Sequence, residues 1–76
     1  MSKTKDWGDL VRTARTRLGL TQEQFAARLG VTFASVNRWE NGHVIPSRLA
    51  LRQIEDLVRG MAADGEDLVR DFFPSE

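Results

Sequence analysis

The sequence predicts an all-α, compact five-helix fold from three observations. Apolar residues recur at intervals of three and four along most of the chain, which is the spacing of one face of an α-helix. Residues that cap or stop helices stand at the ends of these periodic segments. No segment alternates apolar and polar residues for long enough to predict a strand. The 76 residues are expected to form one domain, 1–76, with a core over 6–58.

Each expected helix ends at a glycine or a proline, and each one after the first begins at a capping residue. The first runs from about Asp6 to Leu18 and is stopped by Gly19. Capping residues predict the starts of the other four, at Thr21, Thr32, Ser47 and Asp64. The stops that follow are Gly30, the Asn41-Gly42 pair, Gly60 and Pro74. The last helix, at about 64–73, is an addition to the core.

Composition excludes several classes of function. The chain has no cysteine and one histidine, which removes disulfides, a structural zinc site and a thiol nucleophile. No apolar run approaches the ~20 residues that span a bilayer, and the start lacks the apolar stretch of a secretory signal. We therefore expect a cytoplasmic protein without cofactor, metal or enzymatic activity. The acidic residues of the last third are expected to cap helices and face solvent.

Charge is balanced overall but unevenly distributed. Residues 1–54 contain nine Lys and Arg against four Asp and Glu, whereas residues 55–76 contain two against seven. A local basic surface matters more to a polyanion than the total charge, because screening limits attraction to a Debye length of ~8 to 10 Å. The distribution by itself fits two solvated polar surfaces, and together with the motif at 21–42 it indicates a basic face for DNA and a separate distal face.

The segment 21–42, TQEQFAARLGVTFASVNRWENG, predicts two short amphipathic helices joined by a glycine turn. Thr21 and Gln24 have the spacing of a capping box, and Gly30 stands where a left-handed stop is needed. In the second helix, at about 32–41, Val36 and Trp39 are expected to face the core. That leaves four residues on the outer face: Phe33, Ala34, Asn37 and Arg38.

These features resemble the helix-turn-helix of the lambda repressor/Cro (XRE-like) family. The resemblance covers roughly 10–57 and includes GLTQEQFA, the turn glycine, RWENG and the Pro-Ser start of the next helix. It implies a lambda-repressor-like DNA-binding domain whose helices two and three form the helix-turn-helix. It also implies an intracellular transcription regulator of bacterial or phage type that binds double-stranded DNA as a homodimer.

The outer face of the third helix is expected to read bases in the major groove, since the first turns of a recognition helix enter it. Asn37 can pair with adenine, and Arg38 with guanine or a phosphate. Phe33 and Ala34 have no hydrogen-bonding group and can meet only thymine methyls or the apolar edge of a pyrimidine. An alternative for Phe33 is that it folds back on the core or contacts a protein.

Polar residues around this helix are expected to contact phosphates: Gln22, Thr32, Ser35, His43, Ser47 and Arg48. The resemblance implies the phosphate contact of Gln22, because family members use the matching glutamine for it. Helix capping explains Thr32 equally well, and solvent exposure explains Ser35 and His43. The resemblance also implies a structural salt bridge between Arg15 and Glu40.

The last helix leaves two interpretations open. Its apolar residues form either a dimer surface or a packing face against helices one and four: Leu68, Val69, Phe72 and Phe73. Trp7 either packs under this helix or lies exposed. An alternative function is an antitoxin-like or enzyme-associated interaction protein that binds a protein partner through its acidic C-terminal part.

Overall fold

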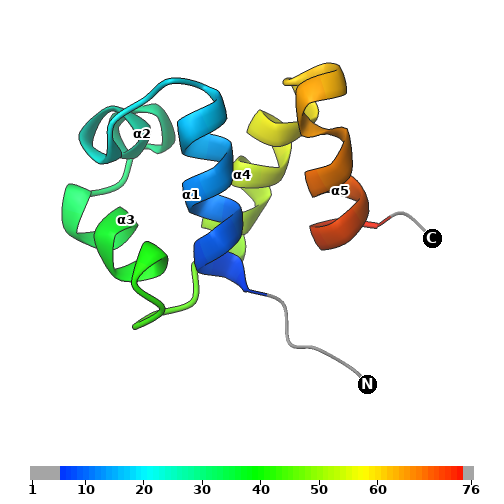
Figure 1. The fold of residues 1–76 in the computed structure, drawn as a ribbon. Helices are drawn as coiled ribbons and strands as arrows, with labels where there is room; N and C mark the ends of the chain where they lie inside the picture. The colour runs from blue at the N-terminus through cyan, green and yellow to red at the C-terminus, as the bar shows by residue number, and fades with distance from the viewer. Residues whose placement is uncertain (1–5, 75–76) are drawn as a thin grey trace.

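A computed structural model describes residues 6–74, and within them every regular element is helical (Figure 1). The elements are α1 (Trp7–Arg17), α2 (Gln22–Leu29), α3 (Phe33–Glu40), α4 (Arg48–Arg59), the short 3₁₀ helix η1 (Ala62–Gly65) and α5 (Glu66–Phe72). The all-α, five-helix prediction is confirmed.

Four helices begin at a side chain that caps the first free backbone N–H groups. Asp6, Thr21, Thr32 and Ser47 each accept a hydrogen bond from the backbone N–H three residues later, at 3.0 to 3.1 Å. The capping box of α2 is complete, because Gln24 Oε1 also accepts from the Thr21 N–H at 2.9 Å. The start signals at 21, 32 and 47 therefore acted as predicted.

The turn between α2 and α3 depends on Gly30. Its φ of +73° places it in the left-handed region, which a residue with a Cβ adopts only with strain. The next N–H, that of Val31, bonds to the Ala26 carbonyl at 2.9 Å and closes the end of α2. The predicted stop at Gly30 is confirmed.

The start of the last helix differs from the prediction. Asp64 lies inside η1, α5 begins at Glu66, and the residue before it, Gly65, provides no side-chain cap. Gly65 is buried so close to the carbonyl oxygen of Val58 that a Cβ there would clash. This close approach holds the link in a tight 3₁₀ turn and moves the start of α5 beyond Asp64.

The helix α1 packs against α3 on one side and α5 on the other, and α4, which lies behind α1 in Figure 1, packs against both α2 and α5. Four core residues of the other helices are fully buried: Phe25 of α2, Val36 of α3, and Ile54 and Val58 of α4. Trp39 is buried as predicted. The scaffold therefore presents α3 at one end of the molecule and α5 at the other.

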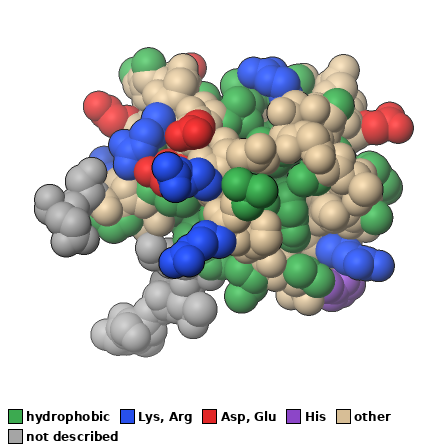
Figure 2. Space-filling model, turned by 180° about the vertical axis from the view of Figure 1, so that it is seen from behind, with side chains coloured by type: hydrophobic (Ala, Val, Ile, Leu, Met, Phe, Trp, Pro, Cys, Tyr) green, Lys and Arg blue, Asp and Glu red, His purple; other side chains and the backbone are tan. Residues whose placement is uncertain are grey.

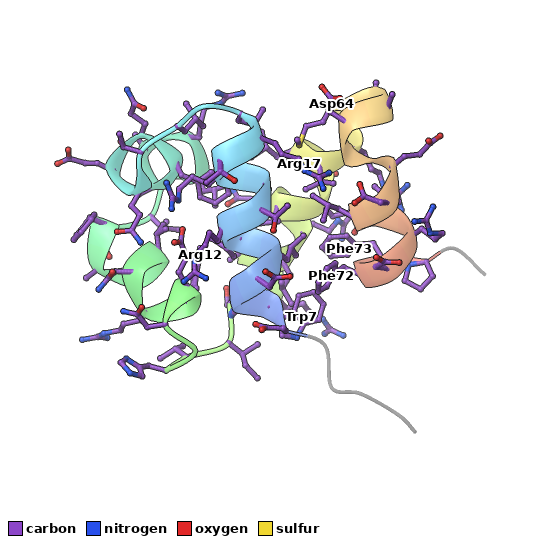
Figure 3. The ribbon with its side chains drawn as sticks, viewed as in Figure 1. Trp7, Arg12, Arg17, Asp64, Phe72 and Phe73 are labelled. Atoms are coloured by element: carbon purple, nitrogen blue, oxygen red, sulfur yellow. The ribbon has the colours of Figure 1, made fainter. Side chains whose placement is uncertain are left out.

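The apolar side of α5 is used within the chain itself. Leu68 is only 6% exposed and belongs to the core, so its assignment to a possible dimer surface is wrong. Val69, Phe72 and Phe73 are half-buried against the same core. The Trp7 ring lies 5.6 Å from that of Phe72 and 6.0 Å from that of Phe73, so Trp7 packs under α5 (Figure 3).

At its other end α5 is joined to α1 by Arg17 (Figure 3). The guanidinium donates to Asp67 Oδ1 at 2.8 Å and to Oδ2 at 3.0 Å, and also to the Asp64 carbonyl at 2.7 Å. Such a two-point contact is the strongest geometry of an arginine–carboxylate pair. Arg17, which belongs to the basic segment 1–54, is thus paired with Asp67 of the acidic segment 55–76.

This ion pair predicts a pH-dependent contribution to stability. The hydrogen bonds from Arg17 lower the pKa of Asp67 from 3.8 to about 2. A carboxyl whose pKa is lower in the folded state stabilises the fold above its unfolded pKa, and this contribution disappears as pH falls through the folded value. We expect Asp67→Asn to be less stable than the wild type at pH 7, with the difference closing between about pH 4 and pH 2.

Urea denaturation of both proteins across this pH range measures the effect. Asp56→Asn is the control, because Asp56 is exposed and has no ion pair within residues 6–74. A difference between Asp67→Asn and wild type that stayed constant down to pH 2 would contradict the pairing.

Candidate nucleic-acid interface

The outward side of α3 is free of the core, as the periodicity predicted. Phe33 is 51% exposed, Ala34 and Arg38 are also exposed, and Asn37 is half-buried. These residues lie one turn apart in the pairs 33/37 and 34/38, so they share one side of the helix. The structure therefore brings all four predicted base readers together.

The other end of α3 is fixed by the carboxylate of Glu40, whose side chain is 2% exposed. Arg15 of α1 donates from Nε to Oε2 at 2.6 Å and from Nη2 to Oε1 at 3.1 Å. The predicted salt bridge is thus present as a two-point contact. Burial alone raises the pKa of the Glu40 carboxyl, but the hydrogen bonds from Arg15 and Gln22 outweigh it and hold the pKa below its ordinary value.

Arg12 is a member of this network that sequence reasoning missed. Its Nη2 donates to the Glu40 carbonyl at 3.1 Å, and its Nε lies 3.6 Å from Glu40 Oε1 (Figure 3). The carbonyl belongs to the last residue of α3, where helix carbonyls lack partners within the helix. A signal was present, because Arg12 precedes Arg15 by three residues and so lies on the same side of α1.

Gln22 has a structural contact that was not predicted. Its Nε2 donates to Glu40 Oε1 at 3.1 Å, which links the start of α2 to the end of α3. An amide nitrogen has two hydrogens, so one remains for a second acceptor. The phosphate contact predicted for Gln22 stays a prediction, to be made through that second hydrogen.

The hydroxyls of Thr32 and Ser35 are hydrogen-bonded to each other at 3.0 Å, in addition to the cap that Thr32 makes. Thr32 therefore caps α3, which is the alternative role expected for it from the sequence. Ser35 is half-buried rather than plainly exposed. Their phosphate contacts remain predictions, with hydroxyls that are already engaged locally.

The loop after α3 and the start of α4 supply the remaining predicted phosphate contacts. His43, Ser47 and Arg48 are all exposed. Ser47 caps α4, so its hydroxyl and the first N–H groups of that helix lie at one end of it. The histidine marks one edge of the molecule in Figure 2, beside hydrophobic side chains. Three exposed apolar residues of this region were not foreseen as such: Val44, Ile45 and Leu49.

Part of the positive charge within residues 6–74 is already paired with carboxylates. Lys3 and Lys5 lie outside the described residues, and Arg12, Arg15 and Arg17 are paired with carboxylates. Four arginines have no ion pair within residues 6–74: Arg28, Arg38, Arg48 and Arg52. Acidic and basic side chains alternate over the side of the molecule that carries α5 (Figure 2). Two of these four arginines, Arg38 and Arg48, lie on α3 and at the start of α4.

Two short helices, α2 and α3, are joined by a turn at Gly30, and α3 presents one side outward while the other helices hold it in place. This arrangement defines a helix-turn-helix domain. A family model described as helix-turn-helix matches residues 11–59, which is more than half of the chain. The chain belongs to this family, which is of the lambda repressor (XRE) type and consists of DNA-binding rather than enzymatic domains. No curated protein and no solved structure gave a significant match.

The described residues carry two further findings. Each helix within 6–74 is too short or too polar to cross a lipid bilayer. The same residues contain no group of three or more His, Cys, Asp or Glu side chains placed to hold a metal ion.

Proposed function

We propose that this protein is a transcription regulator that binds double-stranded DNA without catalysis and inserts α3 into the major groove. The observation that supports it best is the outward side of α3, whose polar and apolar side chains are exposed while its far end is fixed by Glu40. A helix held in this way can present its first two turns to base edges without changing its angle.

Asn37 and Arg38 are the proposed hydrogen-bonding base readers. Neither side chain has a hydrogen bond to another residue within 6–74, although both backbone carbonyls accept one, so both side chains are available to a ligand. The amide of asparagine can donate to and accept from adenine, and the guanidinium of arginine can donate twice to guanine. Selectivity is therefore expected mainly at the two positions that these residues reach.

Arg48 and the start of α4 are the proposed main contact with the phosphate backbone. The Arg48 guanidinium is exposed and unpaired within residues 6–74, and it adjoins the free N–H groups at the start of a twelve-residue helix. Gln22, Thr32, Ser35, Ser47 and His43 would complete this contact. Contacts of this kind fix the register of the protein on DNA.

The experiment is a binding titration of single variants on a site selected from random DNA. Asn37→Ala and Arg38→Ala should each cost about 1 to 3 kcal/mol on that site and relax selectivity at one position. Arg48→Ala should weaken binding to all sequences alike and reduce the salt dependence. Arg70→Ala is the control, because Arg70 is an exposed arginine on α5 at the far end of the molecule.

The result that would contradict this proposal is a set of variants that bind selected and random DNA with the affinity of the wild type. Affinity that did not change with salt concentration would point instead to a protein partner.

The homodimer is a further part of the proposal. One recognition helix reads only a few base pairs, so useful affinity normally requires two copies on half-sites one turn, ~34 Å, apart. A palindromic selected site, together with a mass of two copies per duplex in solution, would support the dimer. A single unrepeated site bound by one copy would refute it.

An interaction protein, antitoxin-like or enzyme-associated, is the second candidate. It is favoured by the exposed carboxylates Glu66 and Asp71 on α5, an element outside the matched residues 11–59. Their replacement by lysine should abolish capture of a basic partner from the native host while DNA affinity stays the same. Loss of DNA affinity in the same variant would argue against a separate protein-binding face.

A further inference from the structure

The first turn of α3 presents only hydrocarbon toward the proposed DNA face. Phe33 and Ala34 are its first two residues, both are exposed, and neither side chain has a donor or an acceptor. The two hydroxyls that flank them, those of Thr32 and Ser35, are bonded to each other and to the helix start. The Phe33 side chain is 51% exposed, so its ring is available to a ligand on this side of the helix.

The second turn has the opposite chemistry. Asn37 lies one turn beyond Phe33, and Arg38 lies one turn beyond Ala34, so each apolar residue is followed on the same side by a hydrogen-bonding one. The reading surface therefore has two levels, apolar at the start of the helix and polar one turn later. A ligand that matches it must offer an apolar group beside donors and acceptors.

The largest apolar group in the major groove is the C5 methyl of thymine, since cytosine offers only a C5–H at the same position. The groove edges of the other bases offer donors and acceptors, and an apolar side chain placed against them removes water without replacing its hydrogen bonds. An apolar pair at the start of a recognition helix is thus expected to accept thymine and to disfavour the remaining bases.

We infer that Phe33 and Ala34 form a thymine-methyl site and are specificity-determining residues. This inference rests on the proposed function, since it assigns a ligand to part of the same surface. The Phe33 ring and the Ala34 methyl group together cover the thymine methyl. The preferred DNA site then contains thymine directly beside the base that Asn37 or Arg38 reads.

The test uses the full chain and the duplex selected for the proposed function. Each thymine of the site is replaced in turn by deoxyuridine, which removes only the methyl group and keeps the base pair. Affinity should fall about four-fold at one or two adjacent positions, the factor expected for one buried methyl or methylene group, and should not change elsewhere. At those positions cytosine should bind worse than 5-methylcytosine.

Variants assign this effect to the two residues. Phe33→Ser and Ala34→Gly should lower affinity for the thymine duplex and abolish the difference between thymine and deoxyuridine. Arg38→Ala is the matched control: it lowers affinity but should keep that difference. Circular dichroism at the titration temperature checks that each variant is folded. Phe33→Leu keeps an apolar side chain and should therefore retain a difference in affinity between the thymine and deoxyuridine duplexes.

The outcomes separate the inference from the proposed function. Tight, selective binding with equal affinity for thymine and deoxyuridine at every position overturns the methyl site and leaves the proposed function intact. A deoxyuridine effect that persists in both Phe33→Ser and Ala34→Gly overturns the assignment to these residues. Absence of any selective DNA binding overturns both, and loss of a protein partner in Phe33→Ser then identifies the ring as a protein contact.

Discussion

Replacement of Glu40 by alanine is expected to lower the free energy of unfolding by about 3 to 5 kcal/mol, the usual effect of breaking a buried ion pair. The change leaves the Arg15 side chain, which is 17% exposed, without its two-point partner. It also removes the acceptor of the Gln22 amide. In a domain of this size such a loss corresponds to a fall in Tm of more than about 10 °C.

Thermal and urea denaturation of Glu40→Ala and Glu66→Ala test this expectation. Glu66 is the matched control because it is an exposed glutamate in the first turn of α5. Its removal should change stability by no more than about 0.5 kcal/mol, as for most surface positions. Equal melting temperatures for the two variants would rule out a stabilising role for the buried pair.

Replacement of Gly8 by alanine is expected to destabilise the protein by about 1 to 3 kcal/mol, as overpacking does. The direction of this change in stability is informative, because replacing glycine by alanine inside a helix normally stabilises the helix by about 1 kcal/mol. A Cβ at Gly8 would lie 2.5 Å from the Trp39 carbonyl oxygen and 3.1 Å from that of Glu40. Both are backbone atoms, so relief requires α1 and α3 to move apart.

Gly60→Ala is the control for this prediction. A Cβ there would have its closest neighbour at 3.4 Å, an ordinary contact, and the φ of Gly60 is −71°. This variant should therefore be neutral or slightly stabilised. If urea denaturation showed Gly8→Ala to be as stable as Gly60→Ala, the close approach of α1 to α3 would be wrong.

The parts of the fold that sequence predicted well depend on neighbouring residues. A threonine three residues before a free N–H, a glycine after the last apolar residue, and the spacing of Val36 and Trp39 are all local features. The same local spacing identified the outward side of α3. The Arg15–Glu40 pair was found differently, through the resemblance of the chain to a family.

The parts that sequence did not predict depend on how distant segments approach each other. Arg17 and Asp67 are 50 residues apart, and nothing in either segment indicates their pairing. The same holds for the Gln22–Glu40 contact, in which a residue expected to face DNA also supports the scaffold. The start of α5 was misplaced because the approach of Gly65 to Val58 is a property of the packed chain.

One carboxylate joins three helices, since Glu40 of α3 holds side chains from both α1 and α2. These hydrogen bonds restrain the angles between α1, α2 and α3. In the proposed complex with DNA, a phosphate contact at the start of α2 would therefore also constrain the tilt of α3 in the major groove. On this proposal, backbone contact and base selection would be coupled through Glu40, and a folded variant that lacks this carboxylate would show lower sequence selectivity.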